Sequence, residues 1–343
     1  EVKVSNFFTK IKEPLLTNLK LEFPAGVRVT KLYPNPLPDL FRGDQLVLAG
    51  RYSLDTSASG GDGEGDLVLN GTLNGQPKRM TKRVKFSGHE SGSEFIAQLW
   101  ALRRVGWLLD EVRLRGENRE LRDEIVDLAR RYAIVTPYTS YLIVEDEARR
   151  GVPVASRSLQ MLDRDAEAQS FYRKSWGDIS GKKDGYDGAL AGRANESLKN
   201  AQTVAPALER AKQENFGGVI AGNAPASEGA AGGMAASKPT SGYARGKMGS
   251  GLALPGKARE VAQRLDDAEQ QTRWVAGKTF TQNGANWTDT SVQSQTNAKR
   301  NRVQFASKEY FDLLASKPES AQWLALGRNV QFTLGNELYE VFE

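Results

Sequence analysis

One low-complexity stretch constrains the fold of this chain more than any other feature. Residues 216–256 are rich in glycine, alanine and serine and contain almost no large apolar side chains. Such a segment cannot bury enough apolar surface to offset the entropy lost on ordering, so we predict a disordered linker there. The linker would divide the 343 residues into a long N-terminal part and a shorter C-terminal part.

The N-terminal part begins with patterns that are typical of short β-strands. Apolar and polar residues alternate over 19–30, and strand-like segments follow at 46–52, 67–73 and 82–86. The dipeptide Asn74-Gly75 favours a tight turn between the last two of these segments. About five short strands with turn signals between them predict an antiparallel β-sandwich.

Two amphipathic helices are predicted behind the strands. Asn118 is placed to cap the second helix, and Pro137 forces the chain out of helix beyond it. The apolar run 141–144 then predicts a return to a strand, which would close this unit near residue 147. The apolar face of the second helix consists of Leu121, Ile125, Leu128 and Tyr132.

The rest of the chain divides at the linker. Residues 148–215 are polar and helix-prone, which predicts a helical or irregular region with little core. Residues 257–343 contain hairpin signals and short helical patterns, which predict a compact α+β module. The predicted fold class is therefore α+β. It combines an antiparallel β-sandwich with two packed helices (14–147), a flexible linker and a small C-terminal α+β module.

Composition excludes several functional classes. The chain has no cysteine, which removes disulfides, thiolate zinc sites and cysteine nucleophiles. The net charge of +5 is a mild excess with acidic residues interspersed, so we expect no nucleic-acid partner. No run of apolar residues is long enough for a transmembrane helix. The sequence begins with Glu1 and enters an apolar-periodic segment at once, so we expect it to be part of a longer protein.

One motif has the spacing of a metal site. Asp55, Ser57 and Ser59 match Asp-x-Ser-x-Ser, the first ligand loop of an A-domain metal site. That site needs oxygen ligands at the edge of a buried parallel strand and further ligands on other loops. Here the motif runs into a glycine-rich acidic loop between two predicted antiparallel strands. We therefore reject these residues as ligands and expect neither a metal nor a cofactor in this chain.

Catalytic patterns are equally sparse. His89 is the only histidine, so a Ser-His-Asp triad or a histidine zinc site would have to be built around one turn residue. Paired carboxylates such as Asp110-Glu111 occur on the predicted polar faces of helices, and we assign no catalytic residue. Trp274 and Trp287 are candidates for an interaction surface, and the alternative is that they form the core of their small module.

The segment Arg131–Leu142, with the sequence Arg-Tyr-Ala-Ile-Val-Thr-Pro-Tyr-Thr-Ser-Tyr-Leu, supports a family assignment together with three other segments. These segments resemble the region that follows the von Willebrand factor A domain in inter-alpha-trypsin inhibitor heavy-chain-like proteins. Those proteins pair a VIT domain with an A domain. The resemblance covers residues 1–146. The other segments are Val4–Ile11, Leu40–Val47 and Leu99–Ala101.

The resemblance implies an architecture and a location. Residues 1–13 would be the last helix of a truncated A domain, and residues 14–147 would form the platform on which that domain sits. The divalent cation of the family would lie in the missing upstream A domain. Members are typically secreted or on the cell surface, which implies an extracytoplasmic location. Residues 258–343 look similar to the C-terminal region of bacterial proteins with this architecture.

Three functions remain open from the sequence. The first is a non-enzymatic scaffold or adhesion fragment that binds a protein or a matrix or polysaccharide ligand. The second is a carboxylate-dependent hydrolase acting on polysaccharide, which needs two carboxylates converging in a pocket and a raised pKa on one of them. The third is a stand-alone binding module, which an exposed patch of Trp274 and Trp287 would favour.

Overall fold

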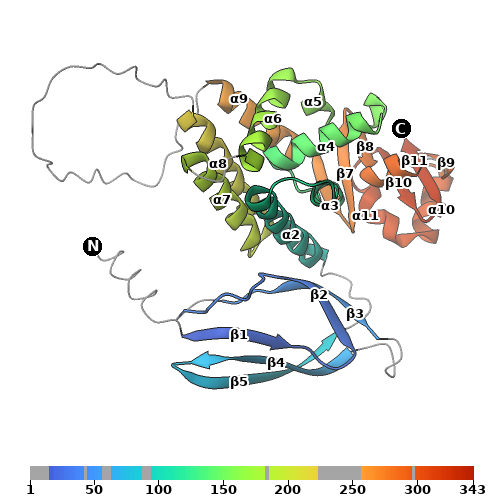
Figure 1. Ribbon diagram of the computed structural model, residues 1–343. Helices are drawn as coiled ribbons and strands as arrows, with labels where there is room; N and C mark the ends of the chain where they lie inside the picture. The colour runs from blue at the N-terminus through green and yellow to red at the C-terminus, as the bar shows by residue number, and fades with distance from the viewer. Residues whose placement is uncertain are drawn as a thin grey trace, which may run out of the picture.

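The computed structural model describes residues 15–41, 45–55, 63–86, 94–181, 185–222, 256–295 and 298–343. These residues form a β-rich region, a group of packed helices and a C-terminal module built on a mixed sheet (Figure 1). The predicted α+β class is confirmed at this level. The predicted helix of residues 1–13 lies outside the described residues.

The β-rich region contains two antiparallel sheets, with strand orders β1-β4-β5 and β2-β3. Asn74 and Gly75 have φ values of 49° and 80° and form the predicted two-residue turn between β4 and β5. The Phe86 ring lies 5.0 Å from the ring of Tyr52 and 6.3 Å from that of Phe23, and so connects the two sheets. The strands are β1 (Leu16–Glu22), β2 (Val27–Tyr33), β3 (Ala49–Leu54), β4 (Gly63–Leu73) and β5 (Gln76–Phe86).

The helix α2 (Glu94–Arg115) is the centre of the helical group. It contacts both strands of the β2-β3 sheet and four helices, which are α3 (Arg119–Arg131), α6 (Ala166–Gly181), α7 (Gly185–Lys199) and α8 (Val204–Gly222). Gly106 allows α7 to approach closely, because a Cβ at this position would lie 2.7 Å from the Cβ of Leu198. Helix α2 is therefore covered on several sides. Its fully buried side chains include Leu102, Val105, Leu108, Leu109 and Val112.

The N-cap prediction at Asn118 is confirmed, but the predicted strand at 141–144 is wrong. The Asn118 side chain accepts a hydrogen bond of 2.9 Å from the backbone N–H of Leu121 at the start of α3. Residues 141–144 lie within helix α4 (Pro137–Arg149). Pro137 starts this helix rather than ending helical structure, because the N–H that proline lacks has no partner in a first turn.

The expectation of little core between residues 148 and 215 is also wrong. Leu162, Tyr172, Ile179 and Leu198 are buried in the same hydrophobic core as α2. Alanines supply much of the rest of this packing, so few large apolar residues are needed. The helices here are η1 (Val154–Ser156), α5 (Gln160–Asp163), α6 (Ala166–Gly181), α7 (Gly185–Lys199) and α8 (Val204–Gly222).

The predicted linker 216–256 is helical at both of its ends. Residues 216–222 belong to α8, and residue 256 begins α9 (Gly256–Gln270). Residues 223–255 lie outside the described residues. Helix α9, which the sequence places in the C-terminal module, buries Val261 and Leu265 in the helical core. The C-terminal module is thus joined directly to a helix that packs with the N-terminal part.

The C-terminal module is a mixed six-stranded sheet in the order β6-β7-β8-β10-β11-β9. Strand β10 is parallel to β8 and β11 is parallel to β9, and neighbouring hairpins supply the antiparallel pairs. Its elements are β6 (Thr272–Val275), β7 (Lys278–Asn283), β8 (Asn286–Asp289), η2 (Thr290–Ser294), β9 (Lys299–Gln304), α10 (Lys308–Ser316), η3 (Pro318–Ser320), α11 (Ala321–Leu324), β10 (Asn329–Leu334) and β11 (Glu337–Phe342).

A buried arginine fixes the β-rich region to the helices. The guanidinium of Arg103 in α2 donates hydrogen bonds to the carbonyl oxygens of Tyr33 (3.1 Å), Val47 (2.5 Å) and Ala201 (2.8 Å). Nearby, Trp100 Nε1 donates to the carbonyl oxygen of Lys31 at 2.9 Å. Across the described residues, no helix combines the length and apolar character needed to cross a membrane.

Candidate interaction groove

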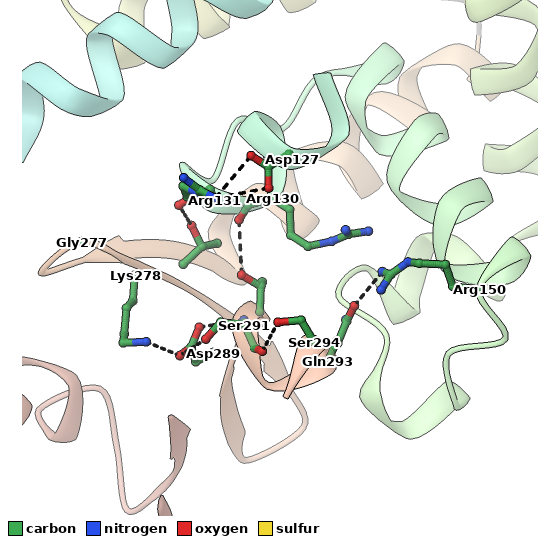
Figure 2. A pocket seen from close by; sticks show the side chains of 12 residues that line it. Asp127, Arg130, Arg131, Arg150, Gly277, Lys278, Asp289, Ser291, Gln293 and Ser294 are labelled. Carbon is green, nitrogen blue, oxygen red and sulfur yellow. Dashed lines mark hydrogen bonds and ion pairs between the residues drawn. The ribbon is translucent and has the colours of Figure 1, made fainter. Parts of the chain in front are cut away.

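A polar groove of about 310 Å³ lies where the helices meet the C-terminal module (Figure 2). The ends of α3 and α4 form one wall, and β7 and η2 form the other. The lining carries four basic and two acidic side chains together with several hydroxyl groups. We call this site the junction groove. Its lining residues are Asp127, Arg130, Arg131, Arg150, Gly277, Lys278, Thr279, Asp289, Thr290, Ser291, Gln293 and Ser294.

Hydroxyl groups of the C-terminal module cap the end of helix α3. Thr279 Oγ1 donates a hydrogen bond of 2.6 Å to the carbonyl oxygen of Arg131. Thr290 Oγ1 donates one of 3.4 Å to the carbonyl oxygen of Arg130. The last carbonyl groups of a helix have no partner within it, so these threonines satisfy α3 from outside. The junction therefore replaces capping by water with contacts between two parts of the chain.

On the module side, the groove is organised by the buried carboxylate of Asp289. Lys278 Nζ lies 2.7 Å from it, and Ser291 donates to it from both its backbone N–H and its hydroxyl group. The backbone N–H of Thr333 in β10 donates at 3.2 Å. Because so many donors converge on it, Asp289 fixes the start of η2 against the sheet.

On the helix side, two neighbouring acidic residues of α4 accept hydrogen bonds from the side chains around the groove. Glu147 is 1% exposed and accepts hydrogen bonds from Ser158 Oγ (2.6 Å) and Gln293 Nε2 (2.9 Å). Asp146 accepts hydrogen bonds from Arg130 at 3.0 Å and Arg150 at 2.8 Å. Gln293 belongs to η2, so the network of α4 extends into the C-terminal module.

The arginines around Asp146 favour the ionised form of its carboxyl group. Burial of Asp146 would raise the pKa of its carboxyl, but hydrogen bonds from Arg149 and Arg130 outweigh that effect, so the pKa lies below its usual value. The Arg130 Nε is buried and has no hydrogen-bond partner among the described residues. The groove thus offers guanidinium and hydroxyl donors at fixed positions, an arrangement suited to holding polar or acidic groups.

The carboxylate pairs that the sequence offered for hydrolysis are committed to ion pairs. Asp110 accepts hydrogen bonds from Lys199 and Arg113, both at 3.0 Å. Burial would raise the pKa of Asp110, but these hydrogen bonds lower it. Among the described residues, every carboxyl group with a clearly shifted pKa is shifted downward. This is opposite to what a general acid of a glycosidase needs.

The residues of the rejected metal motif lie largely outside the described chain. Asp55 is described, and its backbone N–H donates to the carbonyl oxygen of Gly26 at 2.9 Å. Ser57 and Ser59 lie outside the described residues. The rejection of all three residues as ligands therefore stays a prediction.

A different group of acids gathers around a lysine. Lys212 Nζ lies 2.8 Å from Glu209 and 3.0 Å from Asp266, and it also contacts Glu269. The side chain of Lys212 is 4% exposed. Its ammonium group already supplies the positive charge at the centre of these carboxylates.

The tryptophan pair does not form an exposed patch. Trp287 is 5% exposed and belongs to the core of the C-terminal module. Trp274 is partly buried and lies 6.1 Å from the ring of Tyr132, where it packs against the helical core. The two side chains thus pack into different hydrophobic clusters, and their role as an interaction surface stays a prediction.

The segment 131–142, on which the family resemblance rests, has a structural role beside the groove. Thr136 caps α4, and its side chain and that of Thr139 form a reciprocal capping box. Tyr138 Oη donates a hydrogen bond of 2.6 Å to Asn215 Oδ1 in α8. The segment therefore fixes the turn from α3 to α4 and carries the Arg131 carbonyl group, to which Thr279 of the C-terminal module donates.

Sequence comparison finds relatives for part of the chain. It is 30% identical over 152 residues to inter-alpha-trypsin inhibitor heavy chain H3 of Rattus norvegicus, which is 43% of this chain and 17% of that protein. It is 24% identical over 185 residues to heavy chain H4 of Homo sapiens, which is 49% of this chain and 19% of that protein.

No family model and no solved structure matches the chain. It spans less than a fifth of the length of these curated relatives. The chain is thus distantly related to inter-alpha-trypsin inhibitor heavy chains over part of its length.

Proposed function

We propose that this chain is a non-enzymatic interaction scaffold of an extracytoplasmic protein of the VIT/A-domain type. The observation that carries the proposal is the similarity to inter-alpha-trypsin inhibitor heavy chains over 152 residues. In this proposal the divalent-cation site belongs to an A domain upstream. The chain supplies the platform, and the junction groove receives polar or acidic side chains of a protein partner.

The arrangement of charges supports a scaffold over a hydrolase. The carboxylates of Asp110 and Asp146 are held in the ionised form by lysine and arginine neighbours. A binding surface needs fixed donors and acceptors, and the junction groove has them on both walls. Helix α9 and the contacts of Gln293 with Glu147 also join the C-terminal module to the helices. We therefore propose that the chain acts as one body.

The test uses the natural full-length protein and this chain side by side. Surface plasmon resonance should show ligand binding by the full-length protein that is lost with EDTA, and no cation-dependent binding by this chain alone. Polysaccharide hydrolysis should be undetectable with both. Hydrolysis that disappears when a carboxylate of this chain is replaced by its amide would establish the hydrolase alternative instead.

The groove itself is tested by a matched pair of arginines. Arg131 lies in the groove and pairs with Asp127, whereas Arg119 of the same helix pairs with Asp123 outside the groove lining. In the full-length protein, Arg131→Glu should weaken partner binding, and Arg119→Glu should leave it unchanged. Equal affinities for both variants would remove the groove from the proposal.

A further inference from the structure

Strand β5 is an exposed and strongly basic edge. Its eleven residues include five lysines or arginines and no acidic residue, and the first eight positions are all exposed. It lies at one end of the β1-β4-β5 sheet, so its outer edge pairs with no described strand. Figure 1 shows it on the side of the sheet that faces away from the helices. The basic residues are Lys78, Arg79, Lys82, Arg83 and Lys85.

The open edge of β5 is long and regular. The strand pairs with β4 residue for residue from Gln76 to Phe86, without a bulge. Pro77 stays in register with Thr72 although it has no N–H to donate, so its backbone must face the open edge. Because this orientation alternates along an antiparallel strand, Arg79, Thr81 and Arg83 also direct their N–H and C=O groups outward.

The charges of β5 lie on both faces of the sheet. Successive side chains alternate, so Lys78 and Lys82 lie on one face while Arg79 and Arg83 lie on the other. Arg83 is 3.3 Å from the carboxylate of Glu64 on β4. Lys78, Arg79 and Lys82 have no salt bridge with any described residue. An anionic side chain placed on either face would therefore meet an uncompensated cation.

Lysine on an edge strand is also a common protection against aggregation. Protected edges are usually short, bulged or covered, because a long regular edge is a template for another strand. The β5 edge is long, unbulged and uncovered by described residues, and charge is its only protection. Charge of one sign repels a second copy of the same edge but attracts a strand of opposite sign, so it selects a partner.

We propose that the outer edge of β5 binds an extended acidic peptide segment of a partner protein by strand addition. The backbone groups of Arg79, Thr81 and Arg83 pair with the peptide backbone. Acidic residues at alternate positions of the peptide share one face of the extended sheet, where they meet either Lys78 and Lys82 or Arg79. This surface is separate from the junction groove and does not depend on the function proposed for it. A flexible polyanion would use the charges without the backbone edge, and the test separates the two.

The first experiment measures charge recognition with the full 343-residue chain. A fluorescent ten-residue peptide of alternating glutamate and valine is titrated by anisotropy at low salt, with the lysine–valine peptide as the control. The triple variant Lys78→Glu, Arg79→Glu, Lys82→Glu should lose about tenfold or more in affinity for the acidic peptide. Absence of binding by the unmodified chain, or unchanged affinity in the variant, would overturn the proposal.

The second experiment measures the backbone edge without changing charge. Thr81→Pro removes one outward N–H, and Thr81→Ala is its matched control; far-UV circular dichroism verifies the fold of both. Strand addition predicts that Thr81→Pro binds the acidic peptide several-fold more weakly than Thr81→Ala, while both bind dextran sulfate equally. Equal peptide binding by both variants would show a general polyanion surface and refute strand addition.

Discussion

Replacing Arg103 tests how the β-rich region is attached to the helices. Arg103 is 2% exposed, and its guanidinium contacts carbonyl oxygens of three separate segments, with no carboxylate partner among the described residues. Burial alone lowers the pKa of this side chain. Arg103→Met keeps most of the side-chain volume but removes every donor, so the carbonyl groups of Tyr33, Val47 and Ala201 lose a partner.

The size of the effect follows from two opposing contributions. Hydrogen bonds from a charged donor contribute about 1.5–3 kcal/mol each, so losing those to three carbonyl groups costs about 5–9 kcal/mol. Removing a desolvated cation returns several kcal/mol of that cost. We therefore expect the free energy of unfolding to fall by about 2–4 kcal/mol.

Urea denaturation followed by tryptophan fluorescence measures this change, with the midpoint and slope compared between variants. Arg115→Met is the matched control on the same helix, because the Arg115 side chain is 77% exposed and, among the described residues, pairs only with Glu111. Its unfolding midpoint should stay close to that of the unmodified chain. If Arg103→Met costs no more than Arg115→Met, the carbonyl contacts of Arg103 do not hold the β-rich region in place.

Three further predictions follow from packing, capping and charge. Gly106→Ala should destabilise the chain by about 1–3 kcal/mol, because a Cβ there meets Leu198. Gly177→Ala has open space around it and should be neutral or stabilising, and thermal unfolding of both variants measures the difference. Thr136→Ala should cost about 1–2 kcal/mol in urea denaturation, with Thr136→Ser retaining the cap of α4, and equal stability of the two would refute the capping role. The lowered pKa of Asp146 means that its contribution to stability is present above about pH 4 and is lost as the pH falls through its folded value. Denaturation midpoints should therefore decline as the pH falls below about 4, and they should decline less in Asp146→Asn.

Local sequence signals were sufficient to predict a helix cap and a hairpin turn, because each of these features depends on one short segment. The side chain of Asn118 caps α3 and Asn74-Gly75 makes the hairpin turn, as expected from their neighbours alone. Pro137 shows the limit of such reasoning. Proline marks either the end of helical structure or the first turn of a helix, and only the surrounding contacts of Thr136 and Thr139 decide which applies here.

The junction groove is beyond prediction from the sequence, because its walls come from distant segments. Thr279 and Arg131 are separated by 148 positions, and neither carries a signal that points to the other. The helical core of residues 148–215 was missed for another reason. Its packing uses alanines such as Ala191 and Ala194, and the close approach at Gly106, which a count of large apolar residues does not detect.

The central claim is that the C-terminal module and the helices form one scaffold, and cleavage between them tests it most directly. A specific protease site is placed between residues 230 and 245, the purified chain is cut, and its mass in solution is measured by sedimentation velocity. Because Val261 and Leu265 of α9 are buried in the helical core, the two fragments should sediment together with the mass of the uncut chain. The cut Leu265→Asp variant should dissociate. Separate fragments from the cut unmodified chain would contradict the claim.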